Sequence, residues 1–304
     1  MVSREEKVVW FYEQSKMKDW WKANQTLAFH YGYYEKGFRS HNQAILHMND
    51  VVWGMLGLDG TRPLQILDAG CGVGGTSIYL AKKYPLVNFT GISIAPSEVQ
   101  FATELTAQNK VTENTQFLQN NFCDAKFPDG NFDGVFALES INYARDTREF
   151  FQEMYRILKP GGKLVILDGF RTQKRLSPMM QIAYNLWLSG RVIDDLVSIN
   201  DCVMLMTEQK FQQITATDIS SHTAASVLRG VVIGLPFFFS ILTKSIVLLN
   251  RYKRSDDNFY MGVSFCGGLL AVSGRTKYYA VTAKNKSNII REVGSLRTTF
   301  TPIL

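Results

Sequence analysis

Residues 66–75 read ILDAGCGVGG, and this glycine-rich segment constrains the fold more than any other part of the chain. The apolar run LQILDA at 64–69 leads into it, and an amphipathic run follows from residue 75 to Tyr84. Because glycine has no side chain, a loop between a strand and a helix can turn sharply there and press its backbone against a ligand. The amides of the helix N-terminus point into the same space. The segment therefore predicts a strand, a ligand-binding loop and a helix.

Short apolar runs and longer amphipathic runs alternate from Leu64 to Phe170, which is the pattern of parallel βαβ units. Helices are expected after residue 75, from about Pro96, and between Asp146 and Leu158, where Asp146 and Glu149 are spaced like a capping box. Strands are predicted at 64–69, 87–94, 114–120, 132–138 and 163–170.

The alternation ends after Phe170, and helix-like sequence rich in Met and aromatic residues follows. The run at 258–285 has strand character around a Ser-Gly turn and predicts a closing antiparallel hairpin. The expected fold is α/β, a Rossmann-like doubly wound sheet of seven strands with an N-terminal helical lid and a helical insertion after the fifth strand. The expected parts are a lid at 1–60, a ligand-binding core at 61–170, a substrate-binding insertion at 171–257 and the hairpin at 258–304.

Composition limits the class of partner. The 304 residues carry a net charge of +6 from scattered Lys and Arg, without a dense basic block, so the sequence predicts no nucleic-acid binding. The four cysteines form no CxxC pair and the N-terminus is charged where a signal peptide is apolar, so a reducing cytoplasm is expected. The apolar run at 227–250 is interrupted by Pro236 and Lys244 and is interpreted as a pocket wall, a subunit interface or a lipid-touching surface.

The glycines alone do not separate a dinucleotide site from a nucleoside site. A dinucleotide enzyme expects an acidic residue at the end of the second strand, about 20 residues on. Here that position is Ser93, and the nearest carboxylate, Glu98, stands one turn into the next helix. Glu98 either reaches a ribose diol or is a solvated first-turn glutamate that the helix dipole favours.

Four segments together resemble class I S-adenosylmethionine-dependent methyltransferases. They are LDAGCGVGG, GISIAPSEVQFA, NNFCDAKFPDGNFDGVFALES and EMYRILKPGGKLVILD, in the order and spacing of that superfamily. Within it the chain is most similar to the group of sterol C-methyltransferases, tocopherol methyltransferases and cyclopropane fatty acid synthases. FHYGYYEKG at 29–37 resembles the aromatic segment with which that group covers its cofactor.

The resemblance implies that S-adenosylmethionine is the cofactor and assigns residues to it. Asp68, Gly70 and Gly72 would surround its methionine end. Tyr31 and Tyr33 would close the site, unless these two tyrosines serve core packing. The remaining cofactor-binding residues implied are Ser93, Ile94, Glu98, Asn121 and Phe122, with the last two beside the adenine.

The segment ALESINYARD after the fourth strand is predicted to face the transferred methyl group. The resemblance to sterol methyltransferases gives Glu139 a catalytic role, either stabilising a cationic intermediate or accepting its proton. Tyr143 could offer a π-face to positive charge, and His30 could act as a base. Bracing of the loop by Glu139 and packing by Tyr143 are the alternatives. The histidines show no metal-ligand spacing, and no metal site is predicted.

The leading hypothesis is methylation of a carbon of an isoprenoid or lipid-like molecule, such as a sterol or geranyl or farnesyl diphosphate. With a diphosphate, Lys36 and Arg39 could meet phosphate charge and the substrate could bring Mg²⁺. The alternatives are a small-molecule N- or O-methyltransferase of secondary metabolism and a cofactor- or lipid-binding protein without catalysis. Membrane contact is expected to be peripheral at most, and a homo-oligomer is compatible with the sequence.

Overall fold

A single seven-stranded sheet organises the chain, in the order β3-β2-β1-β4-β5-β7-β6. The computed structural model describes residues 3–14, 26–38, 40–247 and 257–286. Along the sheet all pairs are parallel except those made by β7, which runs antiparallel to β5 and to β6. The strands are β1 Leu64–Ala69, β2 Val87–Ser93, β3 Thr115–Gln119, β4 Phe132–Leu138, β5 Leu158–Arg171, β6 Gln212–Asp218 and β7 Thr276–Lys284.

The strand order reverses direction beside β1. The chain passes from β1 to β2 and β3 on one side and then returns to pair β4 with the other side of β1. In open parallel sheets the crevice at such a reversal, at the carboxyl ends of the strands, is where ligands bind. The predicted fold, a Rossmann-like seven-stranded sheet, is confirmed.

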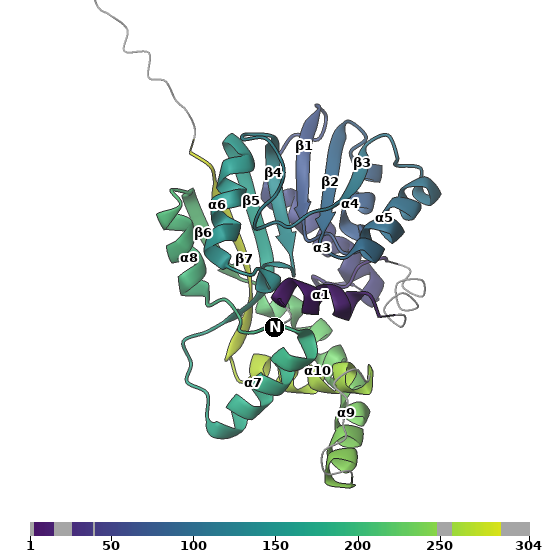
Figure 1. Ribbon diagram of the computed structural model, residues 1–304, viewed down its shortest axis with the longest axis vertical. Helices are drawn as coiled ribbons and strands as arrows, with labels where there is room; N and C mark the ends of the chain where they lie inside the picture. The colour runs from purple at the N-terminus through teal and green to yellow at the C-terminus, as the bar shows by residue number, and fades with distance from the viewer. Residues whose placement is uncertain (1–2, 15–25, 39, 248–256, 287–304) are drawn as a thin grey trace, which may run out of the picture.

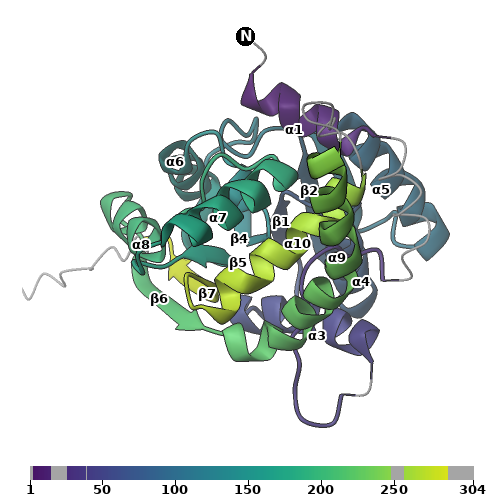
Figure 2. The same cartoon turned by 90° about the horizontal axis from the view of Figure 1, so that it is seen from below.

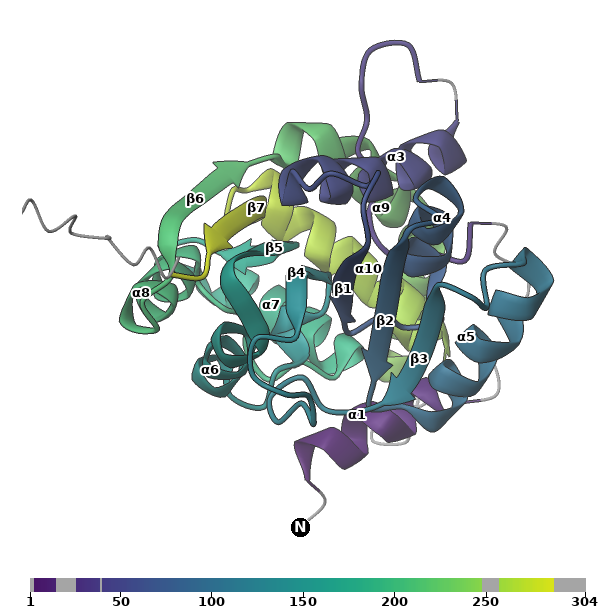
Figure 3. The same ribbon diagram turned by 90° about the horizontal axis from the view of Figure 1, so that it is seen from above.

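Helices cover both faces of the sheet (Figure 3). Neighbouring residues of a strand point to opposite faces, so in β1 Ile66 packs with one core and Leu67 with the other. This double burial explains why the strands read as continuous apolar runs. The first core includes α3 His41–Leu56, α4 Gly75–Lys83 and α5 Pro96–Asn109, and the second includes α6 Thr147–Ile157 and α8 Ile199–Glu208.

The remaining helices lie at the carboxyl edge of the parallel strands. Figures 1 and 2 show α1 crossing this edge and α7, α9 and α10 stacked below it. These helices are α1 Arg4–Tyr12, α7 Pro178–Arg191, α9 Ser220–Val247 and α10 Asp257–Val272, and the short 3-10 helix η1 Ile141–Tyr143 follows β4.

The predicted closing hairpin is wrong in its first strand. Residues 257–272 form helix α10, and β7 pairs instead with β6, a strand that the sequence analysis placed inside a purely helical insertion. In α10 the buried residues Val263, Cys266 and Leu270 recur at helical spacing. The predicted division into 171–257 and 258–304 is corrected accordingly. Helix α7 is inserted between β5 and α8, and α9 and α10 together are inserted between β6 and β7.

The predicted N-terminal lid is only partly helical. In the described part of residues 1–60, α1 and α3 are helices, and residues 27–35 between them form neither helix nor strand. Tyr33 in this segment bonds through its amide to the carbonyl oxygen of Ala44 on α3, at 2.9 Å. The segment therefore passes along α3 toward the carboxyl edge of the sheet.

Candidate active site

The loop after β1 has a backbone that side chains would disturb. Gly70 has φ +93°, and a Cβ on it would lie 2.4 Å from Cβ of Ser140, so a larger residue there meets both strain and a clash. Gly72 has φ +51°, and a Cβ on it would have Oε1 of Glu98 as its nearest neighbour, at 3.8 Å. Space is therefore open above Gly72.

That space is a narrow cavity of about 80 Å³ between the β1 loop, the end of β2 and the loop after β3. Several residues predicted to bind the cofactor line it together. These are Gly70, Gly72, Ser93, Ile94, Glu98, Asn121 and Phe122.

Glu98 is buried, not a solvated surface residue. Its exposed fraction is 6%, and its Oε2 accepts a hydrogen bond of 2.6 Å from Ser93 Oγ. Burial raises the pKa of Glu98 to about 7, while the bond from Ser93 opposes that rise. The carboxylate is thereby fixed at the cavity wall, where it can accept hydrogen bonds from a diol.

Asp68 lies behind the loop and not in the cavity wall. It is buried, and its Oδ2 accepts a 2.8 Å hydrogen bond from Ser77 Oγ in the first turn of α4. Burial raises the pKa of Asp68 to about 7. The structure thus gives Asp68 a position from which it holds the strand, loop and helix together.

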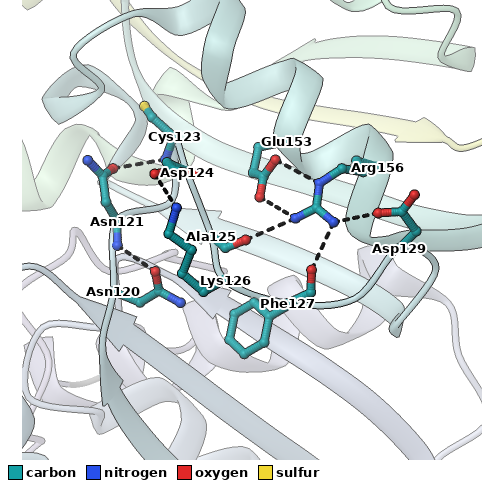
Figure 4. A network of polar contacts seen from close by, with 10 residues as sticks. All are labelled: Asn120, Asn121, Cys123, Asp124, Ala125, Lys126, Phe127, Asp129, Glu153 and Arg156. Atoms are coloured by element: carbon teal, nitrogen blue, oxygen red, sulfur yellow. Dashed lines mark hydrogen bonds and ion pairs between the residues drawn. The ribbon is translucent and has the colours of Figure 1, made fainter.

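The loop that carries Asn121 and Phe122 is fixed by one side chain of α6. The Arg156 guanidinium donates to the carbonyl oxygens of Phe127, at 2.8 Å, and Ala125, at 2.9 Å (Figure 4). Glu153 and Asp129 neutralise its charge. One arginine therefore sets the course of the backbone that follows Asn121.

Helix α1 closes the narrow cavity, a role that the sequence analysis gave to Tyr31 and Tyr33. Glu5, Val8 and Tyr12 of α1 line the cavity. A Ser3–Glu6 capping box begins the helix, and this motif was the signal in the sequence that the prediction overlooked. Arg4 fastens α1 to the rest of the site by donating to the carbonyl oxygen of Asn142, at 2.9 Å.

A second cavity of about 460 Å³ lies on the other side of the loop after β4. Its floor is the carboxyl edge of the sheet, and its walls come from α7, α9 and α10. The apolar wall residues are Trp187, Ile193, Leu196, Ala224, Val227, Leu228, Val231, Leu269, Ala271 and Val272. Residues that follow the fifth strand therefore line this cavity, in agreement with the prediction that they form a pocket wall.

The two cavities share Glu139 and Tyr143. Glu139 follows β4 in a left-handed conformation, φ +53°, which is uncommon for a residue with a side chain. Its Oε1 accepts hydrogen bonds from the amide of Tyr31, at 2.5 Å, and from the hydroxyl of Tyr278, at 2.9 Å. Burial raises the pKa of Glu139 to about 7 despite these bonds. A strained backbone held by two donors is typical of a functional position.

Asp168 and Arg191 also line the large cavity, and the sequence analysis missed both. Asp168 is 6% exposed; its Oδ1 accepts from the amide of Gly169 at 2.7 Å, and its Oδ2 accepts no hydrogen bond from the described residues. Burial, and next the nearby Glu139 carboxylate, raise the pKa of Asp168 to about 8. The sequence held a signal for it, because β1 and β5 both contain Ile-Leu-Asp, at 66–68 and 166–168.

The prediction that His30 is a catalytic base fails on position. Its ring is 8% exposed and lies in the wall of neither cavity, and its nitrogens contact Tyr31 O and Asn49 Oδ1, both at 3.0 Å. Burial lowers the pKa of His30 to about 4. A ring enclosed in this way has no path to a substrate proton.

The two predicted closing tyrosines occupy other places. Tyr31 lines the large cavity, where its ring lies 5.7 Å from that of Tyr278. Tyr33 lines neither cavity and stacks on His222, with ring centroids 4.2 Å apart. Lys36 is exposed and also lines neither cavity, and Arg39 lies outside the described residues.

Comparisons with known proteins agree with this geometry. Residues 67–166 match the family model described as a methyltransferase domain. This range spans the β1 loop, the ends of β2 and β3, and Glu139. The chain therefore carries an S-adenosylmethionine-dependent methyltransferase domain.

Relatives differ in what their names say they methylate. The chain is 40% identical over 136 residues to a 2-methyl-6-phytyl-1,4-hydroquinone methyltransferase of Synechocystis sp., covering 44% of this chain and 39% of that protein. It is 27% identical over 243 residues to norajmaline N-methyltransferase of Rauvolfia serpentina, covering 74% and 80%. The hydroquinone enzyme is thus matched over less than two thirds of its length.

Among solved structures, geranyl diphosphate C-methyltransferase from Streptomyces coelicolor A3(2) has the same fold. The TM-score is 0.70 at 16% sequence identity, and the match covers 93% of this chain and 98% of that one. At this identity the match establishes the fold and leaves the substrate open.

The residues in the wall of the narrow cavity match the adenosyl cofactor in their chemistry. Glu98 presents a carboxylate for the ribose hydroxyls, and the open space above Gly72 lets the loop backbone approach a ligand. Phe122 offers an aromatic ring in the same wall, next to Asn121 in the sequence. These are the residues that would hold S-adenosylmethionine.

Proposed function

We propose that the protein transfers a methyl group to a carbon of an isoprenoid or similar apolar molecule. The observation that carries the proposal is the shared wall: Glu139 and Tyr143 belong both to the narrow cavity and to the large apolar one. A donor on one side and an acceptor on the other would meet only there. Similarity to a relative that acts on a phytyl-substituted hydroquinone supports an acceptor of this class.

When bound, S-adenosylmethionine supplies an electrophilic methyl group that needs no further activation. The protein must then align the acceptor and exclude water. Helix α1 covers the donor side, and Trp187 and Leu196 help to enclose the acceptor side. An alkene acceptor gives its π electrons to the new carbon–carbon bond and becomes a carbocation.

Glu139 is placed to manage that cation. Its carboxylate stabilises positive charge electrostatically and then accepts the proton that the cation loses to restore a double bond. The donors Tyr31 N–H and Tyr278 O–H hold Oε1, which leaves Oε2 for the substrate. Tyr143 adds a ring at the boundary between the cavities.

The charges of the large cavity favour a head group without a diphosphate. Glu139 and Asp168 are acidic, and the cations in its wall are Arg191 and Lys277. Among the described residues, no group of three or more His, Cys, Asp or Glu side chains is arranged to hold a metal ion. A hydroxyl or phenol group suits these walls better than a diphosphate, and Mg²⁺ would have to arrive with a diphosphate substrate.

N-methylation is the second candidate. Two adjacent carboxyl groups, Glu139 and Asp168, would attract an ammonium group, and a relative that is named an N-methyltransferase aligns with 74% of the chain. On this alternative the carboxylates bind the protonated amine and take its proton before transfer.

The test is a product assignment. The purified protein is incubated with ¹³C-methyl S-adenosylmethionine and, separately, a prenylated hydroquinone, a sterol, geranyl diphosphate and a cyclic secondary amine. We expect the label in an organic-soluble isoprenoid, with the methyl carbon coupled to carbon in the NMR spectrum. Label found only on nitrogen or oxygen would refute transfer to carbon.

A further inference from the structure

An apolar stripe runs along the outside of α9. Leu228, Val232, Leu235 and Phe239 follow one another at intervals of four, three and four residues, so they lie on one face of the helix. Their exposed fractions are 62%, 63%, 36% and 57%. A helix that packs on a protein core normally turns its apolar face inward and its polar face to water. This stripe does the reverse.

Apolar side chains are exposed on the neighbouring helices as well. On α10, Leu269 is 38% and Val272 is 87% exposed, and on α7 Met179 and Ile182 are 75% and 62% exposed. Figures 1 and 2 show that α7, α9 and α10 together form the end of the molecule farthest below the sheet. We call these exposed side chains of the three helices the apolar end. Large exposed apolar patches mark sites of interaction.

The large cavity opens onto the apolar end. Leu228, Leu269 and Val272 are exposed and at the same time line that cavity. A molecule that enters or leaves the cavity between α9 and α10 therefore passes over exposed apolar side chains.

Basic side chains flank the apolar end. Arg229 is exposed on α9, and Lys174 and Arg175 are exposed at the start of the segment that leads to α7. Lys174 Nζ bonds to the carbonyl oxygen of Ser273, the neighbour of Val272, at 2.7 Å. Positive charge beside exposed apolar side chains complements anionic headgroups above an acyl layer.

Helix α9 is anchored in the protein along its inner face. Thr223 and Ser226 are 1% and 4% exposed, and Ser226 Oγ accepts a 2.9 Å hydrogen bond from the amide of Gly32. Among the described residues, Ser220–Phe239 is the one helical segment long enough and apolar enough to span a membrane, with a mean hydropathy of 1.4. Length and composition are the only criteria that it meets. A helix fixed to the core on one side can lie on a membrane but cannot cross it without leaving the core.

We infer that the apolar end docks on the surface of an anionic lipid membrane, with the stripe of α9 among the acyl chains and Arg229, Lys174 and Arg175 at the headgroups. In this position the large cavity opens directly to the lipid, so an apolar substrate reaches it without crossing water. The docking depends on the exposed side chains alone. Only the delivery of substrate rests on the proposed function.

Vesicle flotation tests the docking. The full chain is mixed with phosphatidylcholine vesicles with or without phosphatidylglycerol. We expect flotation with the anionic vesicles and at least about fivefold less with the neutral ones or at high salt. The double variant Val232→Glu/Leu235→Glu, which changes residues outside the cavity wall, should lose at least about fivefold of the flotation.

Leu86→Glu is the matched control, because Leu86 is 51% exposed next to the start of β2, at the opposite end of the sheet. It should float as the parent does. Each variant should also keep the parent's affinity for S-adenosylhomocysteine, which shows that the cofactor domain is folded.

Two results would overturn the inference: a parent chain that floats with neither kind of vesicle, or a double variant that floats like the parent. A dimer in sedimentation experiments without lipid, dissociated by the same double substitution, would assign the apolar end to a second copy of the chain instead. Because flotation needs no turnover, a protein that floats but methylates no isoprenoid would leave the docking standing and refute the proposed function.

Discussion

The two cavities that meet at Glu139 are built in different ways. The narrow cavity is made mostly of loops that leave the parallel strands. Gly70 and Gly72 allow the conformation of one loop, and hydrogen bonds from Arg156 hold another. The large cavity is made of helices added around the sheet, and its walls are mostly apolar side chains. This difference is what the proposed function requires: one cavity for a cofactor held in one geometry, and the other for an apolar acceptor.

The largest expected effect lies at the boundary of the two. Glu139→Gln keeps the shape and an acceptor oxygen but removes the negative charge and the base. We expect kcat to fall by about 10²- to 10³-fold, as for other groups that stabilise charge in a transition state. Isothermal calorimetry should show unchanged binding of S-adenosylhomocysteine. Turnover within about twofold of the parent would exclude Glu139 from the chemistry.

A pair of glycine variants separates the cavities next. Gly72→Ala places a methyl group in the narrow cavity and strains a left-handed backbone, so the Kd for S-adenosylhomocysteine should rise by about tenfold or more. Gly169→Ala is the matched control: Gly169 lines only the large cavity, and a Cβ there meets no atom within 4 Å. It should alter the KM for the acceptor and leave cofactor binding intact. Equal effects on cofactor binding would contradict the separation.

The pH dependence of turnover should report the ionisation of the Glu139 carboxyl group, which both cavities share. Glu139 must lose its proton to act as a base, and its pKa is raised to about 7, so kcat should rise about tenfold from pH 6 to pH 8. Besides burial, the groups that bear on this titration are Tyr31, Tyr278 and Arg191. Asp168, whose pKa is raised to about 8, is still neutral while Glu139 titrates, so Asp168→Asn should leave the rise at the same pH. A profile that stays flat in the parent would argue against a titrating base.

The smallest effect is expected from Arg156→Met. This change keeps much of the length of the side chain on α6 but removes the donors to the carbonyl oxygens of Ala125 and Phe127. The loop beyond Asn121 should loosen, and the Kd for S-adenosylhomocysteine should rise by about threefold to fivefold, at most about 1 kcal/mol. The KM for the acceptor should not change. A larger effect on the acceptor than on the cofactor would refute this division of roles.

The same contrast explains what the sequence alone could predict. The order of strand ends places Gly70, Ser93, Asn121 and Glu139 at one edge of a parallel sheet, so local patterns were sufficient for the part of the narrow cavity that the strand ends form. Glu98 was left open between ribose contact and solvent, because its burial depends on Ser93 and on the closing of α1. Such contacts between distant segments have no local signature.

The large cavity could not be predicted in the same way. Residues 257–272 contain Gly267 and Gly268 among apolar and β-branched residues, which favoured a strand. In the structure these glycines let Trp187 and Val231 pack close to α10. A Cβ on Gly267 would lie 2.6 Å from Nε1 of Trp187, and a Cβ on Gly268 would lie 1.9 Å from Cγ2 of Val231. Tertiary packing therefore decided the helix, and with it the partner of β7.

The central claim is that a methyl group passes from the narrow cavity to the large one beside Glu139. A crystal structure with S-adenosylhomocysteine tests it most directly, because the sulfur atom marks where the methyl group leaves. The account predicts the adenosyl group among Glu98, Asn121 and Phe122, with the sulfur at the boundary formed by Glu139 and Tyr143. A sulfur atom turned away from that boundary, or a nucleoside bound outside the narrow cavity, would contradict the account.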